Sequence, residues 1–428
     1  MKYAIVTLGC KVNQFETQAM ETLLQSHGHI PTQNGDADMV IVNTCAVTAE
    51  SGRKSRQAVR RLLHDNPGAA AAVCGCFSQI EPEEMEALGA AVVFGSGDRL
   101  KFVEAVEAAA AERSSVRSVD DPFRRTELEL LPAGALEGRT RAYMKIEDGC
   151  DNFCTYCVIP YARGRVRSMP LRTAAAEAAR LQGEGFWELI VTGIEISSYG
   201  KDFPKERIGL ADVLCAIAKA APETRVRIGS IEPTVITEEF CKKIAACGNI
   251  CPHFHLSLQS GCDKTLKAMH RKYDTAGFLR ATELLRGAFP GCALTADLIT
   301  GFPGETGEDH AATLDFIQRI GFAEMHVFPY SVRPGTKAAA MPGQLTHAVK
   351  NRRAAEAQAA AQRMQQEYLD AQIGRRLQVL FETEQDGLWR GHSDNYCEVC
   401  AAGENLHGVM NYVQIAERDG EKIVGKIV

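Results

Sequence analysis

No hydrophobic run in this sequence of 428 residues reaches the ~18–20 residues that a membrane-spanning helix needs. The opening residues, from Met1 to Val6, lead directly into a strand-like segment, and we see no secretion signal. Basic residues are not in excess either, since 48 Lys and Arg stand against 54 Asp and Glu and give a formal charge of −6. Bulk charge therefore gives no argument for a nucleic-acid partner, whose binding surface would have to be local.

The composition, 45% hydrophobic and 24% charged, is that of a globular protein and excludes a disordered chain, a collagen-like fibre and a disulfide miniprotein. At roughly 150 residues per domain we expect about three domains. Fifteen cysteines is a high and odd number. Without a secretion signal we expect the reducing cytoplasm, where cysteines are candidates for metal or cluster ligation rather than for a disulfide framework.

Residues 1–113 alternate between apolar strand-like runs and amphipathic helical stretches, which predicts an open parallel α/β sheet domain. The strand-like runs are Tyr3–Leu8, Met39–Asn43, Ala70–Val73 and Ala91–Phe94. The helical stretches are Asn13–Ser26, Gly52–His64, Glu83–Leu88 and Leu100–Glu112. Residues 114–138 lack periodicity and are predicted to be a linker.

Residues 139–368 continue the alternation with six β/α units and then a long helix, Ala348–Leu369. Because eight units close a full barrel, six predict a partial (β/α)6 barrel that is open on one side. The expected strands are Ala142–Glu147, Glu188–Thr192, Val226–Ile231, His253–Leu258, Leu294–Thr300 and Glu324–Tyr330. The expected helices between them include Leu171–Glu184, Leu210–Ala220, Glu238–Ala246, Thr275–Phe289 and Asp309–Ile320.

Residues 369–428 show short alternating runs, which predict a small all-β barrel. These runs are Leu377–Glu382, Leu388–Ser393, Cys397–Ala401, Val409–Ile415 and Ile423–Val428. The whole chain is thus predicted to be an α/β protein with an all-β C-terminal domain.

The segment Cys150-Asp-Asn-Phe-Cys154-Thr-Tyr-Cys157 follows the first predicted barrel strand, where such folds carry their chemistry. The C-x3-C-x2-C spacing puts three thiolates on one tight loop. Three thiolates hold three irons of a 4Fe–4S cube and leave the fourth iron open to bind a substrate. The alternative is a zinc knuckle, but zinc sites favour two C-x2-C pairs or Cys/His mixtures, and no second pair or nearby His is present.

A second set of cysteines ends the strands of the N-terminal domain: Cys10, Cys45, and either Cys74 or Cys76. Since ligands of open α/β sheets gather at the carboxyl ends of strands, these three side chains are expected to meet at one edge. The alternative is that each is a small buried hydrophobe. We favour Cys76 as the third member, because Cys76 follows a glycine that permits a turn, as Cys10 does, whereas Cys74 would still be on the strand.

The C-x3-C-x2-C segment, with Tyr156 before its last cysteine, resembles the radical S-adenosylmethionine superfamily. The resemblance implies that S-adenosylmethionine binds the open iron and is cleaved reductively to a radical, and that the backbone beside Tyr156 contacts adenine. Three blocks resemble the methylthiotransferases within it. They are Thr7-Leu-Gly-Cys10-Lys-Val-Asn13-Gln-Phe-Glu16-Thr, Asn43-Thr-Cys45-Ala-Val-Thr with Cys74-Gly-Cys76-Phe-Ser-Gln79, and Gly149-Cys150 to Arg163-Gly164.

Further polar residues and glycines end the barrel strands, where S-adenosylmethionine would lie. The candidate cofactor-binding residues are Tyr156, Gly193, Glu195, Ser230, Glu232, Gln259 and Asp297. The resemblance implies two 4Fe–4S clusters, one on Cys150, Cys154 and Cys157 and one on Cys10, Cys45 and Cys76. In the family the second cluster carries the sulfur that joins the substrate carbon.

The C-terminal segment resembles the TRAM module, an RNA-binding β-barrel. Trp389 and Tyr396 could stack on bases, or they could fill the barrel. Arg163, Arg165 and Arg167 lie beside the cluster loop and could position phosphates or a substrate carboxylate. Period-two geometry would point Cys397 and Cys400 to opposite faces, which disfavours a metal site there. The remaining cysteines are interpreted as core or incidental thiols: Cys215, Cys241, Cys247, Cys251, Cys262 and Cys292.

The Gly-Cys-Lys-Val-Asn-Gln-x-Glu-Thr block resembles the branch that acts on N6-threonylcarbamoyladenosine in tRNA. The implied enzyme adds a methylthio group at C2 of that base beside the anticodon, with the anticodon stem-loop, an electron donor and a sulfur source as partners and no membrane. Alternatives are the same chemistry on isopentenyladenosine in tRNA or on an Asp of a ribosomal protein. An alternative of another class is a non-catalytic RNA-binding iron–sulfur redox sensor.

Overall fold

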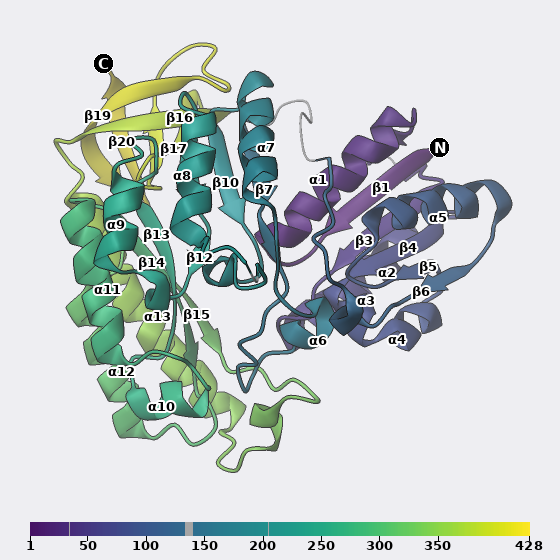
Figure 1. Ribbon diagram of the computed structural model, residues 1–428, viewed down its shortest axis with the longest axis horizontal. Helices are drawn as coiled ribbons and strands as arrows, with labels where there is room; N and C mark the ends of the chain where they lie inside the picture. The colour runs from purple at the N-terminus through teal and green to yellow at the C-terminus, as the bar shows by residue number, and fades with distance from the viewer. Residues whose placement is uncertain (34, 133–139, 204) are drawn as a thin grey trace.

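The computed structural model describes residues 1–33, 35–132, 140–203 and 205–428. An N-terminal α/β unit lies beside a central barrel, and a small β-barrel covers one end of that central barrel (Figure 1). Within the described residues no helix is both long and apolar enough to cross a membrane.

The N-terminal sheet is fully parallel, with the strand order β2-β1-β3-β4-β5-β6. Its strands are β1 (Lys2–Thr7), β2 (Ile30–Pro31), β3 (Met39–Thr44), β4 (Ala70–Gly75), β5 (Ala90–Phe94) and β6 (Val116–Ser118). Its helices are α1 (Lys11–Ser26), α2 (Ala49–Asp65), α3 (Cys76–Ile80), α4 (Pro82–Ala87) and α5 (Arg99–Glu112). The short edge strand β6 lies inside the segment predicted to be a linker; residues 133–139, where that segment ends and the predicted barrel domain begins, lie outside the described residues.

The central barrel has six parallel strand positions, as predicted, and it is open between the first and the last of them. The third strand is interrupted at Gly229, so that β11 pairs with β10 and β12 pairs with β13. The strands are β7 (Arg141–Lys145), β10 (Glu188–Thr192), β11 (Arg225–Ile228) with β12 (Ser230–Ile231), β13 (His253–Gln259), β14 (Ala293–Thr300) and β15 (Glu324–Pro329). A two-stranded ribbon, β8 (Glu147–Asp148) with β9 (Arg167–Ser168), follows β7.

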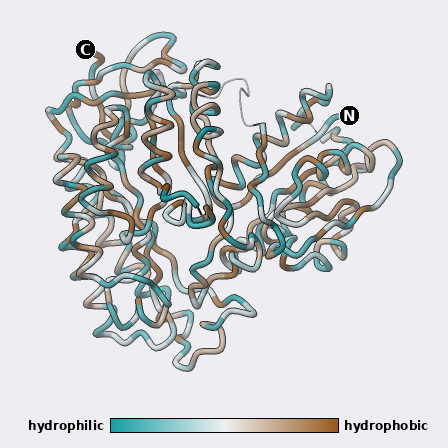
Figure 2. Tube along the Cα trace, in the orientation of Figure 1, coloured by the Kyte–Doolittle hydropathy of each residue, from teal (hydrophilic) through white to brown (hydrophobic). Residues whose placement is uncertain are grey.

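Helices cover the outer face of the barrel strands (Figure 1). They are α7 (Leu171–Gly183), α8 (Leu210–Ala220), α9 (Glu238–Ala245), α11 (Thr275–Ala288), α12 (Gly307–Ile320) and α13 (His347–Asp370). The short helix α6 (Ile159–Arg163) lies instead against α3 of the N-terminal unit, and the short helix α10 (Asp263–Ala268) follows β13. Short 3-10 turns lie at Pro122–Arg124, Ile196–Ser198, Pro233–Val235 and Lys337–Ala340. Hydrophilic and hydrophobic residues alternate along these outer helices, as expected when a helix buries only one face (Figure 2).

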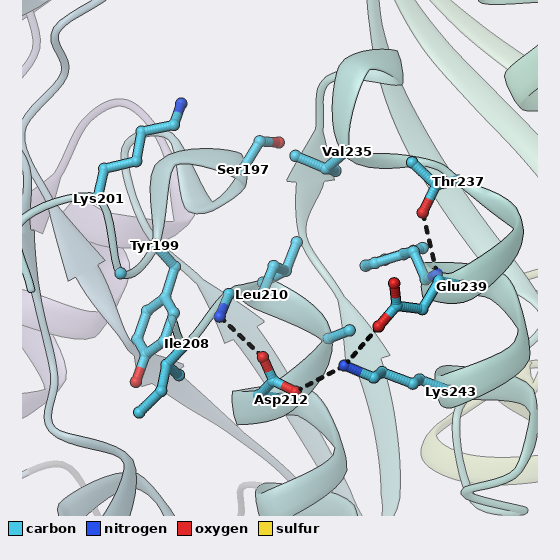
Figure 3. Close-up of a pocket in the computed structure, with 14 residues that line it drawn as sticks. Ser197, Tyr199, Lys201, Ile208, Leu210, Asp212, Val235, Thr237, Glu239 and Lys243 are labelled. Carbon is cyan, nitrogen blue, oxygen red and sulfur yellow. Dashed lines mark hydrogen bonds and ion pairs between the residues drawn. The ribbon is translucent and has the colours of Figure 1, made fainter. Parts of the chain in front are cut away.

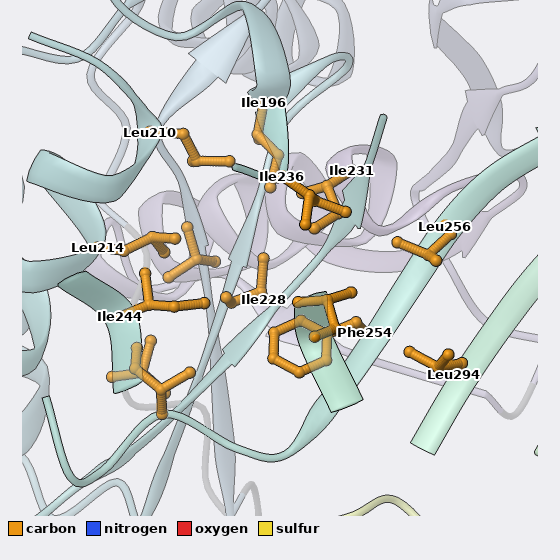
Figure 4. Close-up of a cluster of buried hydrophobic side chains, with 14 of the residues drawn as sticks. Ile196, Leu210, Leu214, Ile228, Ile231, Ile236, Ile244, Phe254, Leu256 and Leu294 are labelled. Atoms are coloured by element: carbon orange, nitrogen blue, oxygen red, sulfur yellow. The ribbon is translucent and has the colours of Figure 1, made fainter. Parts of the chain in front are cut away.

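The largest hydrophobic core lies between the barrel strands and these helices. Figure 4 shows part of it, where Ile228, Ile231 and Phe254 of the strands meet Leu214 and Ile244 of the helices. Burial of this apolar surface fixes the strands and therefore the loops at their ends, which carry the site residues.

The C-terminal domain is a closed barrel with the strand order β16-β17-β18-β20-β19, which confirms the predicted small all-β barrel. Its strands are β16 (Arg376–Gln385), β17 (Leu388–Ser393), β18 (Glu398–Ala401), β19 (Met410–Asp419) and β20 (Lys422–Ile427). It docks against the amino ends of the central strands. There Arg225 donates to the carbonyl of His392 at 2.9 Å, and Arg227 donates to the carbonyl of Asp394 at 2.9 Å.

Candidate active site

A cavity of about 650 Å³ runs through the interior of the central barrel. The start of α1, the C-x3-C-x2-C loop, the carboxyl ends of the strands and the docked C-terminal barrel all contribute to it. Its lining includes Cys10, Lys11, Cys150, Cys154, Tyr156, Cys157, Gly193, Glu195, Ser230, His253, His255, Arg271, Thr295, Asp297, Glu324, His326 and Tyr396. Its volume is that of an ordinary small-molecule site.

Backbone hydrogen bonds hold the C-x3-C-x2-C loop in a fixed shape. The Cys150 amide donates to the carbonyl of Gly164 at 3.0 Å, and the Cys157 amide donates to the carbonyl of Cys154 at 3.0 Å. Thr155 pins the loop to the end of α10, because its amide and hydroxyl donate to the carbonyls of Met269 and Ala268. The three thiols therefore project from one rigid segment.

Arg271 links this loop to the barrel. Its Nη1 donates to Sγ of Cys154 at 3.2 Å, and its other Nη lies 2.6 Å from Glu232. Asn152 also donates to Glu232, at 3.0 Å. A guanidinium aimed at a thiol favours the thiolate, which is the form that binds metal.

The N-terminal cysteines Cys10, Cys45 and Cys76 are brought together at the carboxyl edge of the sheet, where the thiols act on one another electrostatically. Gly9, with φ +109°, permits the approach, since a Cβ built there would lie 2.9 Å from Sγ of Cys45. Asn13 fastens the same edge, because its side chain donates to the carbonyl of Leu8 at 2.7 Å.

Cys74 and Cys76 face different surroundings. Cys74 is fully buried in the hydrophobic core, and its thiol lies 4.0 Å from the sulfur of Met20. Cys76 is the first residue of α3, and its thiol accepts a hydrogen bond from Nε of Arg163 at 3.1 Å. Burial raises the pKa of Cys76, and Arg163 opposes that rise. Cys76 therefore has the direct arginine hydrogen bond that favours a thiolate, whereas the thiol of Cys74 packs against Met20.

Arg163 is the centre of a buried ion-pair network between the N-terminal sheet and the barrel. Its guanidinium pairs with Glu16, and it lies 3.4 Å from Asp148. Arg99 pairs with Glu16 at 3.0 Å, and Lys145 with Asp148 at 3.1 Å. These five side chains are almost completely inaccessible to solvent, and each charge has an opposite charge beside it, as buried ions require.

Five of the seven predicted cofactor residues line the cavity: Tyr156, Gly193, Glu195, Ser230 and Asp297. The other two are absent from the lining formed by the described residues. Glu232 is buried behind it, and Gln259 ends β13 with a φ of +63°. Burial, and then the neighbouring Glu232, raise the pKa of Glu195 to about 7.

The residues predicted to contact RNA differ in how accessible their side chains are. Trp389 is only 8% exposed and packs in the core of the C-terminal barrel, so its ring is not offered to a base. Arg163 is buried in the network described above, and Arg167 is buried with its Nη1 donating to the carbonyls of Arg163 and Arg165. Arg165 is exposed and pairs with Asp151 at 2.9 Å.

Tyr396 lines the cavity but already has ring partners. It stacks on His253 at 4.7 Å and on His392 at 4.9 Å between ring centroids, and the Arg227 guanidinium lies over its ring. Its faces are therefore occupied by protein groups rather than open to a base. His392, the second of these ring partners, also binds Glu382 at 2.9 Å.

Lys11 reaches the cavity from the first turn of α1. Burial and the nearby Arg227 lower its pKa, while Glu188 raises it. In the sequence Lys11 is only one residue of the block that indicates the family branch, and Arg271 belongs to none of the motifs, so neither side chain was predicted to line the cavity.

All fifteen cysteines are free thiols. Cys397 packs in the core of the C-terminal barrel, and Cys400 is buried nearby. Cys215 and Cys247 lie with their sulfurs 3.0 Å apart, a proximity that the sequence did not predict.

A second pocket, of about 360 Å³, lies outside the barrel between the Ser197–Asp212 segment and α9. Figure 3 shows that Lys243 bridges Asp212 and Glu239 along its wall, at 3.0 and 3.1 Å. Its lining among the described residues includes none of the six predicted cluster cysteines.

The donor set fits iron–sulfur clusters. Each trio offers three thiols, and in each trio one thiol accepts a hydrogen bond from a buried arginine. Among the described residues, no three His, Cys, Asp or Glu side chains approach closely enough to hold one metal ion together. The cavity beside the C-x3-C-x2-C loop also offers the carboxyl groups of Glu195 and Asp297 to a cationic ligand.

Two family models match the chain. The radical SAM superfamily matches residues 144–317, and the uncharacterized protein family UPF0004 matches residues 2–95. The threonylcarbamoyladenosine tRNA methylthiotransferase MtaB of Bacillus subtilis is 37% identical and covers 96% of this chain and 93% of its own length. Its namesake from Thermotoga maritima is 35% identical, with coverages of 98% and 95%.

The tRNA-2-methylthio-N(6)-dimethylallyladenosine synthase of Jannaschia sp. is 33% identical and covers 100% of this chain and 94% of its own length. Among solved structures, the radical S-adenosylmethionine methyltransferase TsrM from Kitasatospora setae has a TM-score of 0.58 at 16% identity. It covers 79% of this chain and 77% of its own. That likeness is one of fold.

Proposed function

Because the chain belongs to the radical S-adenosylmethionine methylthiotransferase family, we propose that it methylthiolates N6-threonylcarbamoyladenosine beside the anticodon of tRNA, at C2 of the base. The observation that carries the proposal is the shared cavity, whose wall contains Cys10 of one trio and all three cysteines of the other. Five relatives at 32–37% identity bear the name of this activity.

The cofactors of the family are an iron–sulfur cluster and S-adenosylmethionine. We propose two 4Fe–4S clusters, one held by Cys150, Cys154 and Cys157, the other by Cys10, Cys45 and Cys76. When bound, these groups supply the radical and sulfur chemistry that an unactivated C–H bond requires and that acid–base side chains cannot provide.

The residues of the chain position and shield these groups. The thiols of the two trios anchor the clusters, and Arg163 and Arg271 donate hydrogen bonds to Cys76 and Cys154, which favours their thiolate forms. Glu195 and Asp297 offer acceptors to the amino and hydroxyl groups of S-adenosylmethionine. The docked C-terminal barrel closes the amino end of the cavity with Tyr396 and so limits access of water.

Partners follow from this activity. We propose the tRNA anticodon stem-loop as substrate, together with an electron donor and a sulfur source. Fifteen free thiols and oxygen-sensitive clusters suit a reducing compartment, for which we propose the cytoplasm.

Mass spectrometry of tRNA nucleosides from a deletion strain tests the proposal. Loss of 2-methylthio-N6-threonylcarbamoyladenosine, restored by the wild-type gene but not by Cys154→Ala, would support it. Loss of the methylthio group from isopentenyladenosine, or an unchanged tRNA profile, would instead favour the second tRNA base or the ribosomal Asp. If the reconstituted protein releases no 5′-deoxyadenosine under reducing conditions, the non-catalytic sensor becomes the better explanation.

A further inference from the structure

Two cationic side chains, Lys11 and Arg271, line the cavity, and they differ in whether they have a carboxylate partner. Arg271 has the carboxylate of Glu232 at 2.6 Å, whereas no ion pair or hydrogen bond of the Lys11 ammonium is found among the described residues. The surrounding charges do not replace such a partner. Glu188 is fully buried and is already shared by Arg225 and Arg227, at 2.5 and 2.8 Å.

Asp297, a cavity-lining carboxylate whose charge also acts on Lys11, lies 3.2 Å from Nε2 of His255. An ammonium that is largely removed from water and not paired is unfavourable, so natural proteins seldom keep one without a counter-ion. Since no carboxylate of the described residues pairs with it, the ammonium is open to an anionic group from outside the chain.

The cavity around Lys11 is polar rather than apolar. Thr295 holds two imidazoles in place, with its hydroxyl 2.9 Å from Nδ1 of His255 and 3.2 Å from Nε2 of His253. Glu324 and His326 complete this part of the wall. An apolar base substituent such as dimethylallyl would leave these groups and the ammonium without partners, which costs binding free energy.

The modified adenosines in the names of the two groups of relatives differ in the polarity and charge of the substituent on N6. Threonylcarbamoyl ends in a carboxylate and carries a hydroxyl and urea-like N–H groups, whereas dimethylallyl is a hydrocarbon. Both substituents leave the adenine at N6, beyond N1 as seen from C2. Lys11 directly follows Cys10, so a base whose C2 faces the N-terminal trio would extend its N6 substituent along the same wall.

We propose that the Lys11 ammonium binds the carboxylate of the threonylcarbamoyl group and thereby selects the substrate. This inference rests on the function proposed above and assigns its substrate preference to one side chain. Amino-acid carboxylates can come from the modified base or from S-adenosylmethionine, and the experiment below separates the two sources.

The test measures binding by the reconstituted holoenzyme to three RNA hairpins of one sequence. The adenosine beside the anticodon is unmodified in the first, carries threonylcarbamoyl in the second, and carries the neutral methylamide of that group in the third. The wild-type protein should prefer the second hairpin to the third by about 10- to 100-fold, the range expected when one charge-assisted hydrogen bond is lost.

Lys11→Met should reduce that preference to less than about threefold, because it removes the charge and keeps the length of the side chain. Lys11→Arg should keep most of the preference, which controls for disruption of α1. Lys219→Met is the matched control, since Lys219 is exposed on the outer helix α8, and it should bind all three hairpins as the wild type does.

Three outcomes would overturn the inference. One is a wild-type protein that binds the second and third hairpins equally, and another is a Lys11→Met protein that keeps the full preference. The third is a Lys11→Met protein with weakened affinity for S-adenosylmethionine and an intact preference, which would assign Lys11 to the cofactor. If the wild-type protein adds methylthio to the second hairpin in any of these cases, the proposed function survives; if it modifies none of the hairpins, that function fails as well.

Discussion

Nε of Arg163 donates a hydrogen bond to Sγ of Cys76 at 3.1 Å, across the boundary between the N-terminal sheet and the central barrel. The same guanidinium pairs with Glu16 of α1 and with Asp148, two residues before Cys150. One buried side chain therefore touches a thiol of the first trio and the segment that leads into the second. The relative position of the two trios depends on this contact.

Arg163→Met should destabilise the protein strongly, because Glu16 and Asp148 would each lose a buried counter-charge. Breaking a buried ion pair from one side typically costs about 3–5 kcal/mol. The urea midpoint should fall, and the iron content after reconstitution should fall with it. Arg163→Lys keeps the positive charge but loses the forked set of donors, so its urea midpoint and iron content should lie between those of the wild type and of Arg163→Met. An unchanged midpoint for Arg163→Met would mean that the network does not hold the domains together.

Replacing any one of Cys150, Cys154 and Cys157 by Ala should remove about four iron atoms per chain, from about eight to about four, because a cube needs all three anchors. Release of 5′-deoxyadenosine should stop. Iron analysis and chromatography of anaerobic reaction mixtures measure both effects. A variant that still cleaves S-adenosylmethionine would contradict the assignment of these ligands.

The neighbours Cys74 and Cys76 provide a matched pair of variants. Cys76→Ala should lose about four iron atoms and keep some cleavage of S-adenosylmethionine, whereas Cys74→Ala should keep about eight. Cys74 contributes only to packing, beside Met20, so its replacement should lower stability slightly. Iron loss in the Cys74 variant rather than the Cys76 variant would reverse the choice of the third ligand.

Much of the fold follows from local sequence. Strand-length apolar runs and amphipathic helices recur with clear spacing, so the parallel N-terminal sheet, the parallel central barrel and the small C-terminal barrel could be predicted from periodicity. The edge strands β2 and β6 could not, because two or three residues carry no periodic signal. The interruption of the third barrel strand at Gly229 also depends on neighbouring strands rather than on its own residues.

The site shows the same division. Cysteines that end parallel strands could be located from the sequence, because the topology of a parallel sheet places all strand ends of this kind at one edge. The direction in which a basic side chain points could not be predicted in this way, since it depends on partners that are far away in the sequence. Arg163 meets Glu16 at a separation of 147 residues, so a basic cluster in the sequence became a buried network in the structure. Trp389 posed a similar ambiguity, because both faces of a barrel strand can accept an aromatic ring.

Glu382 gives the docking of the C-terminal barrel a pH dependence. Burial alone would raise its pKa, but the hydrogen bond from His392 and the charge of Arg141 outweigh this and lower the pKa from 4.5 to about 2. A carboxyl whose pKa falls on folding stabilises the protein above its unfolded pKa. That contribution, about 3 kcal/mol, should be lost as the pH falls from about 4.5 to about 2.

Glu382→Gln should therefore lower the free energy of unfolding at about pH 7, and the difference from wild type should shrink as the pH falls below about 4.5. Urea titrations at several pH values, followed by fluorescence, would measure it. Glu384→Gln, on the same strand but exposed, is the control and should have little effect at any pH. A deficit in Glu382→Gln that stays constant with pH would assign its role to packing rather than to charge.

Arg165 is the member of the predicted arginine trio that remains accessible, with its side chain 61% exposed beside the C-x3-C-x2-C loop. If Arg165 contacts an RNA phosphate, Arg165→Gln should weaken binding of modified and unmodified hairpins alike. The number of ions released on binding, measured from the slope of log affinity against log salt concentration, should then fall by about one. Arg352→Gln, which replaces an exposed arginine on α13, is the matched control.

Trp389→Phe should keep the wild-type RNA affinity, because its ring is enclosed in the barrel core. An RNA affinity that falls for Trp389→Phe and not for Arg165→Gln would show that RNA binds at a surface opened by movement of the C-terminal barrel, contrary to the enclosed position of the Trp389 ring.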